Sequence, residues 1–130
     1  MKRHGILNSS ISKVLADLGH TDRIAIADAG LPIPAGTVKI DLALKEGVPG
    51  FIEVVQVVQE EMCVEKVTTA EEMVSNPAVH RKMKEMFTDI GMDERSHEAF
   101  KQELADVKAV IRTGEMTPYA NCILHAGVIF

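Results

Sequence analysis

Apolar residues recur along the chain in two patterns, one typical of helices and one typical of buried strands. Between Ile11 and Leu18 they fall at helical spacing, which predicts an amphipathic helix that is capped by one of Asn8-Ser9-Ser10 and ends at a left-handed Gly19. Residues 23–28 have a continuous apolar middle, as expected of a strand buried on both faces. The sequence therefore predicts a helix and a strand that meet at a polar turn.

The remaining chain repeats this alternation of helices and strands. Such alternation is typical of an α/β domain whose sheet is covered on both faces. The closing strands follow one another without an intervening helix, so we expect a mixed sheet in a single three-layer α/β/α domain over residues 1–130. The further predicted strands are 37–44, 64–69, 108–112 and 120–130 (the last bent at Gly127 or divided in two), and the further helices begin after Pro49, after Asn76 and at Ser96.

Composition and charge narrow the class of protein. Hydrophobic residues make up 46% of the chain and aromatic residues 4%, so the core must be aliphatic and rich in methionine. The formal net charge of -5 and the lack of basic runs argue against a nucleic-acid partner, which needs clustered Lys and Arg. We expect a folded domain that binds no nucleic acid.

The two cysteines and the amino terminus bear on the compartment. Cys63 and Cys122 lie in a predicted helix end and strand, so we expect two small buried thiols in a reducing compartment. The amino terminus lacks the apolar run of a signal peptide, and no stretch approaches the roughly 20 apolar residues of a membrane span. The sequence predicts a cytoplasmic protein with no membrane partner.

Two titratable side chains flank the first predicted strand. His20 follows the helix end and Asp28 stands where the strand stops. A base and an acid at the two ends of a buried strand suggest a proton-transfer site, because an imidazole titrates near neutral pH. The alternative is structural: His20 would then interact with the helix dipole, and Asp28 would cap backbone amides in a turn.

A second polar segment, residues 112–121, contains the only tyrosine of the chain. Tyr119 lies close to Asn121, and a ring beside a carboxamide suits a sugar, since the ring covers C–H faces while the amide binds hydroxyls. The alternative is a solvated loop between strands. No His-x-x-x-His or Cys-x-x-Cys spacing is present, so we expect no metal site.

Several of these segments, in order, resemble the D-ribose pyranase / L-fucose mutarotase family. The resemblance runs from His4-Gly5 to the end of the chain, and the ribose branch is the more similar one at Leu31-Pro32-Ile33-Pro34 and Thr117-Pro118-Tyr119-Ala120-Asn121. It implies a cofactor-independent isomerase that interconverts the β-pyranose and β-furanose forms of D-ribose. By the same resemblance His20 is the proton donor, and the sugar is bound by Asp28, His97, Tyr119, Ala120 and Asn121.

The resemblance also implies a ring-shaped homo-oligomer, a pentamer or a decamer, with sites at subunit contacts. Spacing supports this expectation, because a strand rising about 3.3 Å per residue separates His20 from Asp28 by roughly 15–25 Å. Either the His20 turn folds back over the strand, or a neighbouring subunit supplies one of the two side chains. The alternatives in function are an L-fucose or general sugar mutarotase and a non-catalytic sugar-binding accessory protein of ribose uptake.

Overall fold

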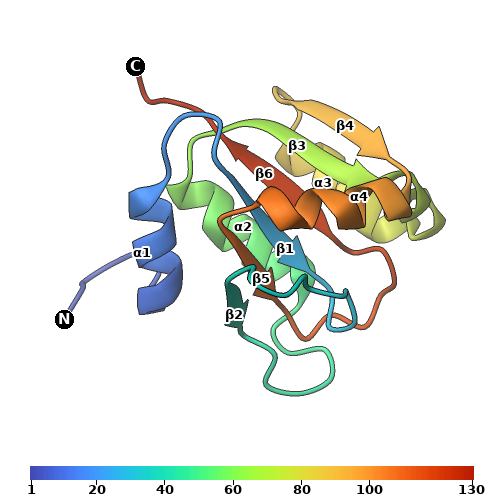
Figure 1. The fold of residues 1–130 in the computed structure, drawn as a ribbon, viewed down its shortest axis with the longest axis horizontal. Helices are drawn as coiled ribbons and strands as arrows, with labels where there is room; N and C mark the ends of the chain where they lie inside the picture. The colour runs from blue at the N-terminus through green and yellow to red at the C-terminus, as the bar shows by residue number, and fades with distance from the viewer.

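A six-stranded mixed sheet forms the centre of the molecule, with helices on both of its faces (Figure 1). In the computed structural model, which describes residues 1–130, the strand order is β2-β5-β1-β6-β3-β4. The first strand, β1, runs parallel to β5 and antiparallel to β6, so the predicted mixed sheet is confirmed. The strands are β1 (Arg23–Ala27), β2 (Lys39–Asp41), β3 (Val64–Ala70), β4 (Gly91–Arg95), β5 (Ala109–Arg112) and β6 (Cys122–Ala126), and the α-helices are α1 (Ser9–Asp17), α2 (Phe51–Glu61), α3 (Pro77–Met86) and α4 (His97–Glu103).

The two faces of β1 explain why the layers are unequal. Ile24 and Ile26 join the larger core, which α1, α2 and α3 cover, whereas Ala25 and Ala27 point to the other face and meet α4. The small alanine side chains leave room for Phe100 of α4, which is fully buried. The three-layer α/β/α fold predicted from the sequence is therefore confirmed, with three helices on one face and one on the other.

Some predicted element bounds are wrong, and the reasons are local. Strand β2 is only three residues long, and β6 ends before Gly127, so that glycine bends no strand. Strand β4 carries one large apolar residue, Met92, and lies at the edge of the sheet beside β3, so its hydrophobic pattern is too weak to predict a strand. The predicted helix start is confirmed, because the Asn8 side chain accepts a hydrogen bond from the backbone of Ile11.

The predicted left-handed Gly19 is also wrong. Helix α1 ends at Asp17, Leu18 is extended, and the left-handed residue of this turn is Thr21, with φ of 70°. The Asp22 carboxylate accepts a hydrogen bond from the Gly19 N–H at 2.8 Å and closes the turn without a left-handed glycine. This turn presents His20 to solvent.

The two thiols differ in exposure. Cys122 is buried in β6, as predicted, and burial raises the pKa of its thiol. Cys63 is exposed, contrary to the prediction, because it lies just beyond α2, where its Sγ donates to the Val128 carbonyl at 3.1 Å. No helix of this structure is long or apolar enough to cross a bilayer.

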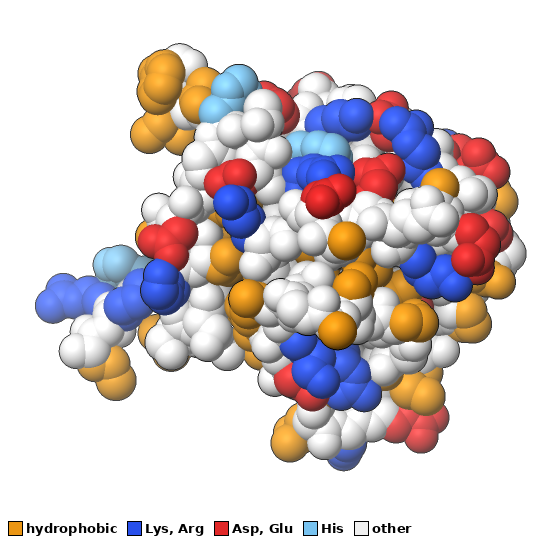
Figure 2. Space-filling model, viewed as in Figure 1, with side chains coloured by type: hydrophobic (Ala, Val, Ile, Leu, Met, Phe, Trp, Pro, Cys, Tyr) orange, Lys and Arg blue, Asp and Glu red, His pale blue; other side chains and the backbone are white.

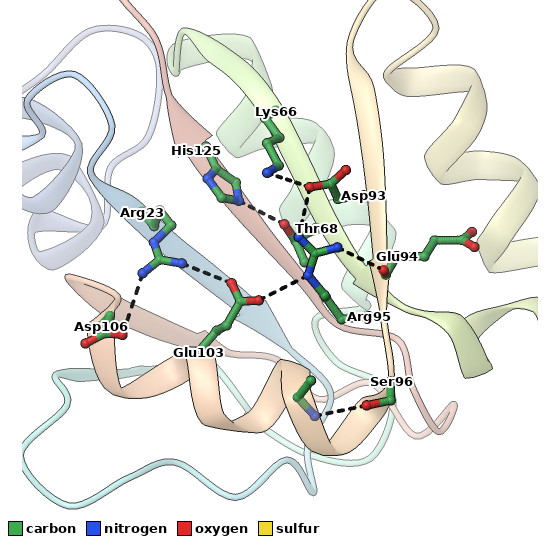
Figure 3. A network of polar contacts seen from close by, with 11 residues as sticks. Arg23, Lys66, Thr68, Asp93, Glu94, Arg95, Ser96, Glu103, Asp106 and His125 are labelled. Atoms are coloured by element: carbon green, nitrogen blue, oxygen red, sulfur yellow. Dashed lines mark hydrogen bonds and ion pairs between the residues drawn. The ribbon is translucent and has the colours of Figure 1, made fainter.

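A network of charged side chains fastens α4 to the sheet (Figure 3). Glu103 of α4 accepts a hydrogen bond from Arg23 of β1 at 3.0 Å and lies 3.6 Å from Arg95 of β4. On the neighbouring strands, His125 Nε2 and the Thr68 hydroxyl are 2.9 Å apart. The network holds the helix whose first residue is His97.

We predict that His125 makes the folded protein less stable below neutral pH. Burial, together with Lys66 and Arg23, lowers the pKa of His125, while Glu103 and Asp93 oppose the shift. The unfolded chain therefore binds this proton more readily, so the free energy of unfolding falls as the pH drops through about 6.5 toward the lowered value.

Replacing His125 with glutamine removes this titration and keeps a partner for Thr68. We expect the denaturant midpoint to fall between pH 7.5 and about pH 5.5 in the natural protein and to fall less in His125→Gln, as measured by urea unfolding. Carboxyl groups add little in this interval because their unfolded pKa values lie near 4. An equal fall in both proteins would contradict the prediction.

Candidate functional site

The predicted sugar-binding residues meet where β1 ends and β6 begins. Asp28 follows the last residue of β1, and Asn121 precedes the first residue of β6, which runs antiparallel beside it. A cavity of about 350 Å³ opens here, within the range of small-molecule sites (about 300–1,000 Å³). Its lining consists of Asp28, Ala29, Gly30, Leu31, Pro32, His97, Glu115, Met116, Pro118 and Tyr119.

Asp28 is held rigidly by Asn121. The Asn121 side chain accepts from the Asp28 backbone N–H at 2.7 Å and donates to the Asp28 carboxylate at 2.9 Å. The other carboxylate oxygen accepts from the Gly30 N–H at 2.9 Å. Each oxygen keeps a lone pair for a ligand hydroxyl, whereas Asn121 itself is fully buried. In this chain the Asn121 side chain orients Asp28 and does not line the cavity.

Tyr119 lies at the third position of a tight turn that begins at Thr117. The Ala120 N–H donates to the Thr117 carbonyl at 3.3 Å, and Tyr119 has a φ of 65°. A proline at the second position and a left-handed third residue are typical of a type II turn, in which glycine usually occupies the third place. The side chain of Asn76 fixes the turn from outside, donating to the Pro118 carbonyl at 2.6 Å. Backbone strain of this kind persists where the surroundings enforce it, often at ligand sites.

His97 forms the opposite wall of the cavity as the first residue of α4. Its backbone N–H donates to the Glu72 carboxylate at 2.9 Å, and its ring meets Tyr119 edge-on with centroids 5.0 Å apart. The ring also stacks on buried Phe100 at 6.5 Å. Its buried Nδ1 has no hydrogen-bond partner within the chain. His97 and Tyr119 therefore lie against each other in the wall of one cavity.

Glu115 organises the loop below the cavity. Burial by itself would raise the pKa of the Glu115 carboxyl, but hydrogen bonds from Phe51 and Thr117, and one from Met116, outweigh it and lower the pKa. Its oxygens thus accept from the first residue of α2 and from its own loop. The backbone carbonyl of Glu115 accepts from the Ala29 N–H at 2.8 Å. Glu115 thus links its own loop to the loop after Asp28, and both loops line the cavity.

The sequence analysis missed three residues that support the site. Arg112 donates to the Ala29 carbonyl at 3.0 Å and to both oxygens of Asp41, and so holds the loop after Asp28. Asn76 was predicted as a helix cap, but its side chain binds the Tyr119 turn and makes no cap hydrogen bond. Glu72 gives no signal in the sequence, because its contact with His97 spans 25 residues.

His20 lies at the other end of β1 and is not part of this cavity. Its Nε2 is 2.9 Å from a carboxylate oxygen of Glu65, at the start of β3. The five residues of β1 separate it from Asp28, a span of about 16 Å. The His20 turn therefore does not fold back over the strand. His125 points into the network of Figure 3, far along β6 from Asn121.

Other hollows lack this combination of groups. The one between α1 and β2, of about 430 Å³, is lined by four apolar residues and by Ser10, Lys13, Asp17, Lys39 and Lys108. No group of three or more His, Cys, Asp or Glu side chains is placed to hold a metal ion. The cavity beside Asp28 is the one that offers a carboxylate, an imidazole and a phenol together.

We predict that Asn121→Asp weakens sugar binding at this cavity. The change would place a second carboxylate against that of Asp28 in a buried position, where like charges repel strongly. We expect the affinity for D-ribose, the sugar that the resemblance in the sequence implies, to fall by at least about 10-fold at pH 7.5 and to recover in part near pH 5, where the pair can share a proton. The loss of the buried hydrogen bond should lower the free energy of unfolding by about 1–3 kcal/mol.

Titration calorimetry at the two pH values tests this prediction. Asn8→Asp is a matched control, because aspartate can still accept the cap hydrogen bond of α1. Equal affinity of the Asn121 variant and the natural protein would show that Asn121 does not support Asp28.

The chain was compared with known protein families, sequences and solved structures. Residues 1–129 match the RbsD / FucU transport protein family. The chain is 63% identical to D-ribose pyranase of Bacillus licheniformis over 131 aligned positions, with all of both chains covered. The solved structure of Bacillus subtilis RbsD complexed with D-ribose is 57% identical, with a TM-score of 0.97 and full coverage of both chains.

A more distant structure shares the fold alone. The fucose mutarotase of Streptococcus pneumoniae in complex with L-fucose is 23% identical, with a TM-score of 0.83, and the match covers 99% of this chain and 100% of the other. The full-length family match and the high identity to its relatives lead to one conclusion. This chain belongs to the RbsD / FucU transport protein family.

Proposed function

We propose that this protein is an isomerase that interconverts the β-pyranose and β-furanose forms of D-ribose. The observation that carries the proposal is the cavity beside Asp28, in a chain 57% identical to a protein whose structure was solved with D-ribose. The relatives named D-ribose pyranase match this chain over its whole length. The family resemblance noted in the sequence thus agrees with the groups that line the cavity.

Ring opening and closing need only an acid and a base as catalysts, because the C–O bond that breaks and the one that forms belong to the sugar itself. Opening the pyranose breaks the bond between C1 and the ring oxygen, which receives a proton, while the anomeric hydroxyl loses one and becomes the aldehyde oxygen. Closing the furanose joins the hydroxyl oxygen of C4 to C1, with loss of that proton and protonation of the aldehyde oxygen. An imidazole can donate and accept these protons near neutral pH. An imidazole placed beside the sugar would therefore supply the proton transfers that ring opening and closing require.

We assign His20 as the proton donor and the groups of the cavity as sugar ligands. Asp28 accepts hydrogen bonds from hydroxyls, and His97 and Tyr119 enclose the pentose between an imidazole and a phenol. Ala120 and Asn121 are both buried behind the cavity wall: Ala120 closes the Tyr119 turn by donating to the Thr117 carbonyl, and Asn121 acts through Asp28. The free aldehyde must rotate before closure, so these ligands should grip one end of the sugar and leave C1 mobile.

In this proposal a neighbouring subunit supplies His20. About 16 Å of strand lies between His20 and Asp28, further than a pentose reaches. A head-to-tail contact that brings one subunit's His20 to the next subunit's cavity closes into a ring, consistent with a pentamer or decamer. The exposed apolar tail beside the His20 turn, Val128–Phe130, would lie in that contact; Figure 2 shows it projecting from the body.

We further propose a cytoplasmic location, which suits two unpaired cysteines.

Magnetisation-transfer NMR on D-ribose, with and without the protein, tests the function. We expect faster exchange between the β-pyranose and β-furanose signals when the protein is present. Binding without faster exchange would indicate a non-catalytic sugar-binding protein and contradict the proposal. Faster exchange of L-fucose than of ribose would indicate a fucose mutarotase, the function named for the more distant Streptococcus pneumoniae structure.

A further inference from the structure

We propose that Glu65 is a positioning residue that holds the Nε2–H of His20, so that His20 exchanges protons with the sugar through Nδ1. This inference rests on the proposed function, because it concerns how the proton donor is oriented. The contact itself is direct: Glu65 Oε2 and His20 Nε2 are 2.9 Å apart. An ionised carboxylate only accepts hydrogen bonds, so the imidazole must donate from Nε2. In neutral His20 the lone pair is then on Nδ1.

The backbone around Glu65 is built to direct this side chain. In the pairing of β3 with β6, Val64 lies opposite Ala126 and Lys66 opposite His125, which leaves Glu65 as the extra residue of a β-bulge. Bulges re-aim a side chain and are over-represented next to active sites. Lys66, the next residue, joins Asp93 in the network of Figure 3, whereas Glu65 contacts the His20 turn. Because of the bulge, the adjacent side chains of Glu65 and Lys66 reach different partners, His20 and Asp93.

Gly127 lies close to Glu65 and is a second feature that fixes the position of the Glu65 side chain. A Cβ at Gly127 would lie 3.1 Å from Glu65 Cβ and 3.5 Å from the same Oε2 that binds His20. A side chain at residue 127 would push Glu65 Cβ and Cys63 Sγ away by a few tenths of an ångström, so glycine leaves Glu65 its place beside the end of β6. The Gly127 N–H donates to the Cys63 carbonyl at 2.8 Å, which fixes the distance between the two segments.

The His20 turn is equally constrained. The Thr21 N–H donates to the Ala126 carbonyl at 2.9 Å, and the Ala126 N–H donates to the Asp22 carbonyl at 2.8 Å. Thr21 is β-branched, so its φ of 70° is strained and persists only because these hydrogen bonds enforce it. Such strain on an otherwise exposed turn is explained if the direction of His20 matters. Glu65 completes the arrangement by selecting the ring nitrogen that faces the substrate.

The test compares Glu65→Ala and Glu65→Gln with matched changes at Glu60, an exposed glutamate of α2. We expect Glu65→Ala to slow ribose exchange by roughly 10- to 100-fold, part of what positioned acid–base catalysis supplies, with ribose affinity within about threefold. Glutamine keeps an acceptor oxygen, so Glu65→Gln should restore much of the rate. The Glu60 variants should exchange ribose at the natural rate.

A spectroscopic readout separates positioning from a merely structural role. In protein labelled with ¹⁵N-histidine, neutral His20 of the natural protein should be almost entirely the Nε2–H tautomer, and in Glu65→Ala the share of the Nδ1–H tautomer should rise toward that of a free histidine side chain. His20 protonated on Nδ1 in the natural protein would overturn the inference, as would a slower Glu65→Ala enzyme whose His20 tautomer is unchanged. If His20→Ala abolishes exchange and Glu65→Ala does not slow it, only this inference fails. If His20→Ala exchanges ribose normally, the assignment of the proton donor fails.

Discussion

Under the proposed function, we expect the replacement of His20 with alanine to lower the rate of ribose ring exchange by about 10²- to 10⁴-fold, the contribution typical of positioned acid–base catalysis. The reason is that the proposal places no other imidazole where the ring oxygen needs a proton. His97 contacts Tyr119 and belongs to the binding wall, and His125 lies in the network of Figure 3. Affinity for ribose should stay within about threefold, because an interaction used only in the transition state changes rate and not binding.

Magnetisation-transfer NMR measures the rate, and titration calorimetry measures the affinity. Ring opening proceeds in water without a catalyst, so the rate must be compared with that of ribose alone. His4→Ala is the matched control, since His4 lies exposed in the amino-terminal arm. An unchanged rate in the His20 variant would exclude it as the proton donor. A large loss of affinity would instead make it a sugar ligand.

The sequence predicted the layers of the fold better than it predicted the ends of its elements. Strand β1 and helix α2 carry long apolar patterns, and their packing follows directly from the spacing of Ile24, Ile26 and Phe51. Strand β4 was missed because an edge strand with Asp93, Glu94 and Arg95 has little apolar surface to bury. A pattern of burial cannot identify an element that is barely buried.

Some residues of the candidate site could be predicted from the sequence, and others could not. Asp28 could be singled out because it follows a strand with a recognisable pattern, and Tyr119 and Asn121 because the only tyrosine of the chain lies near a carboxamide. Their supports could not: the contact of Asn76 with Pro118 joins segments 42 residues apart, and that of Arg112 with Ala29 joins segments 83 apart. Only the fold brings these groups together, and no spacing rule applies across such distances.

The left-handed residues illustrate a limit of turn rules. Glycine was expected at the end of α1, but the strained positions are Thr21 and Tyr119, one in each of the two polar turns. Thr21 adjoins the proposed proton donor, and Tyr119 is a proposed sugar ligand. The rule that glycine occupies left-handed positions fails at such places. A turn at a functional site can hold another residue in a strained conformation when the surrounding contacts enforce it.

Two inactive variants should restore activity when they assemble together, if one subunit supplies His20 and the next supplies Asp28. A mixture of His20→Ala and Asp28→Ala chains in equal amounts then places both natural residues at about one quarter of the sites, because each site draws its two residues from two different chains. Activity should rise from near zero to roughly a quarter of the natural level. Chains refolded together or co-expressed with different tags provide the mixed rings.

A dilution experiment distinguishes this arrangement from sites within one chain. When natural chains assemble with an equal amount of the His20→Ala/Asp28→Ala double variant, shared sites keep about one quarter of full activity, whereas sites within a single chain keep about one half. The His20 turn faces away from the cavity of its own chain and is fixed there by its backbone contacts with Ala126. We therefore expect the lower value, and one half in the dilution with no recovery in the mixture would show that His20 reaches Asp28 within one subunit.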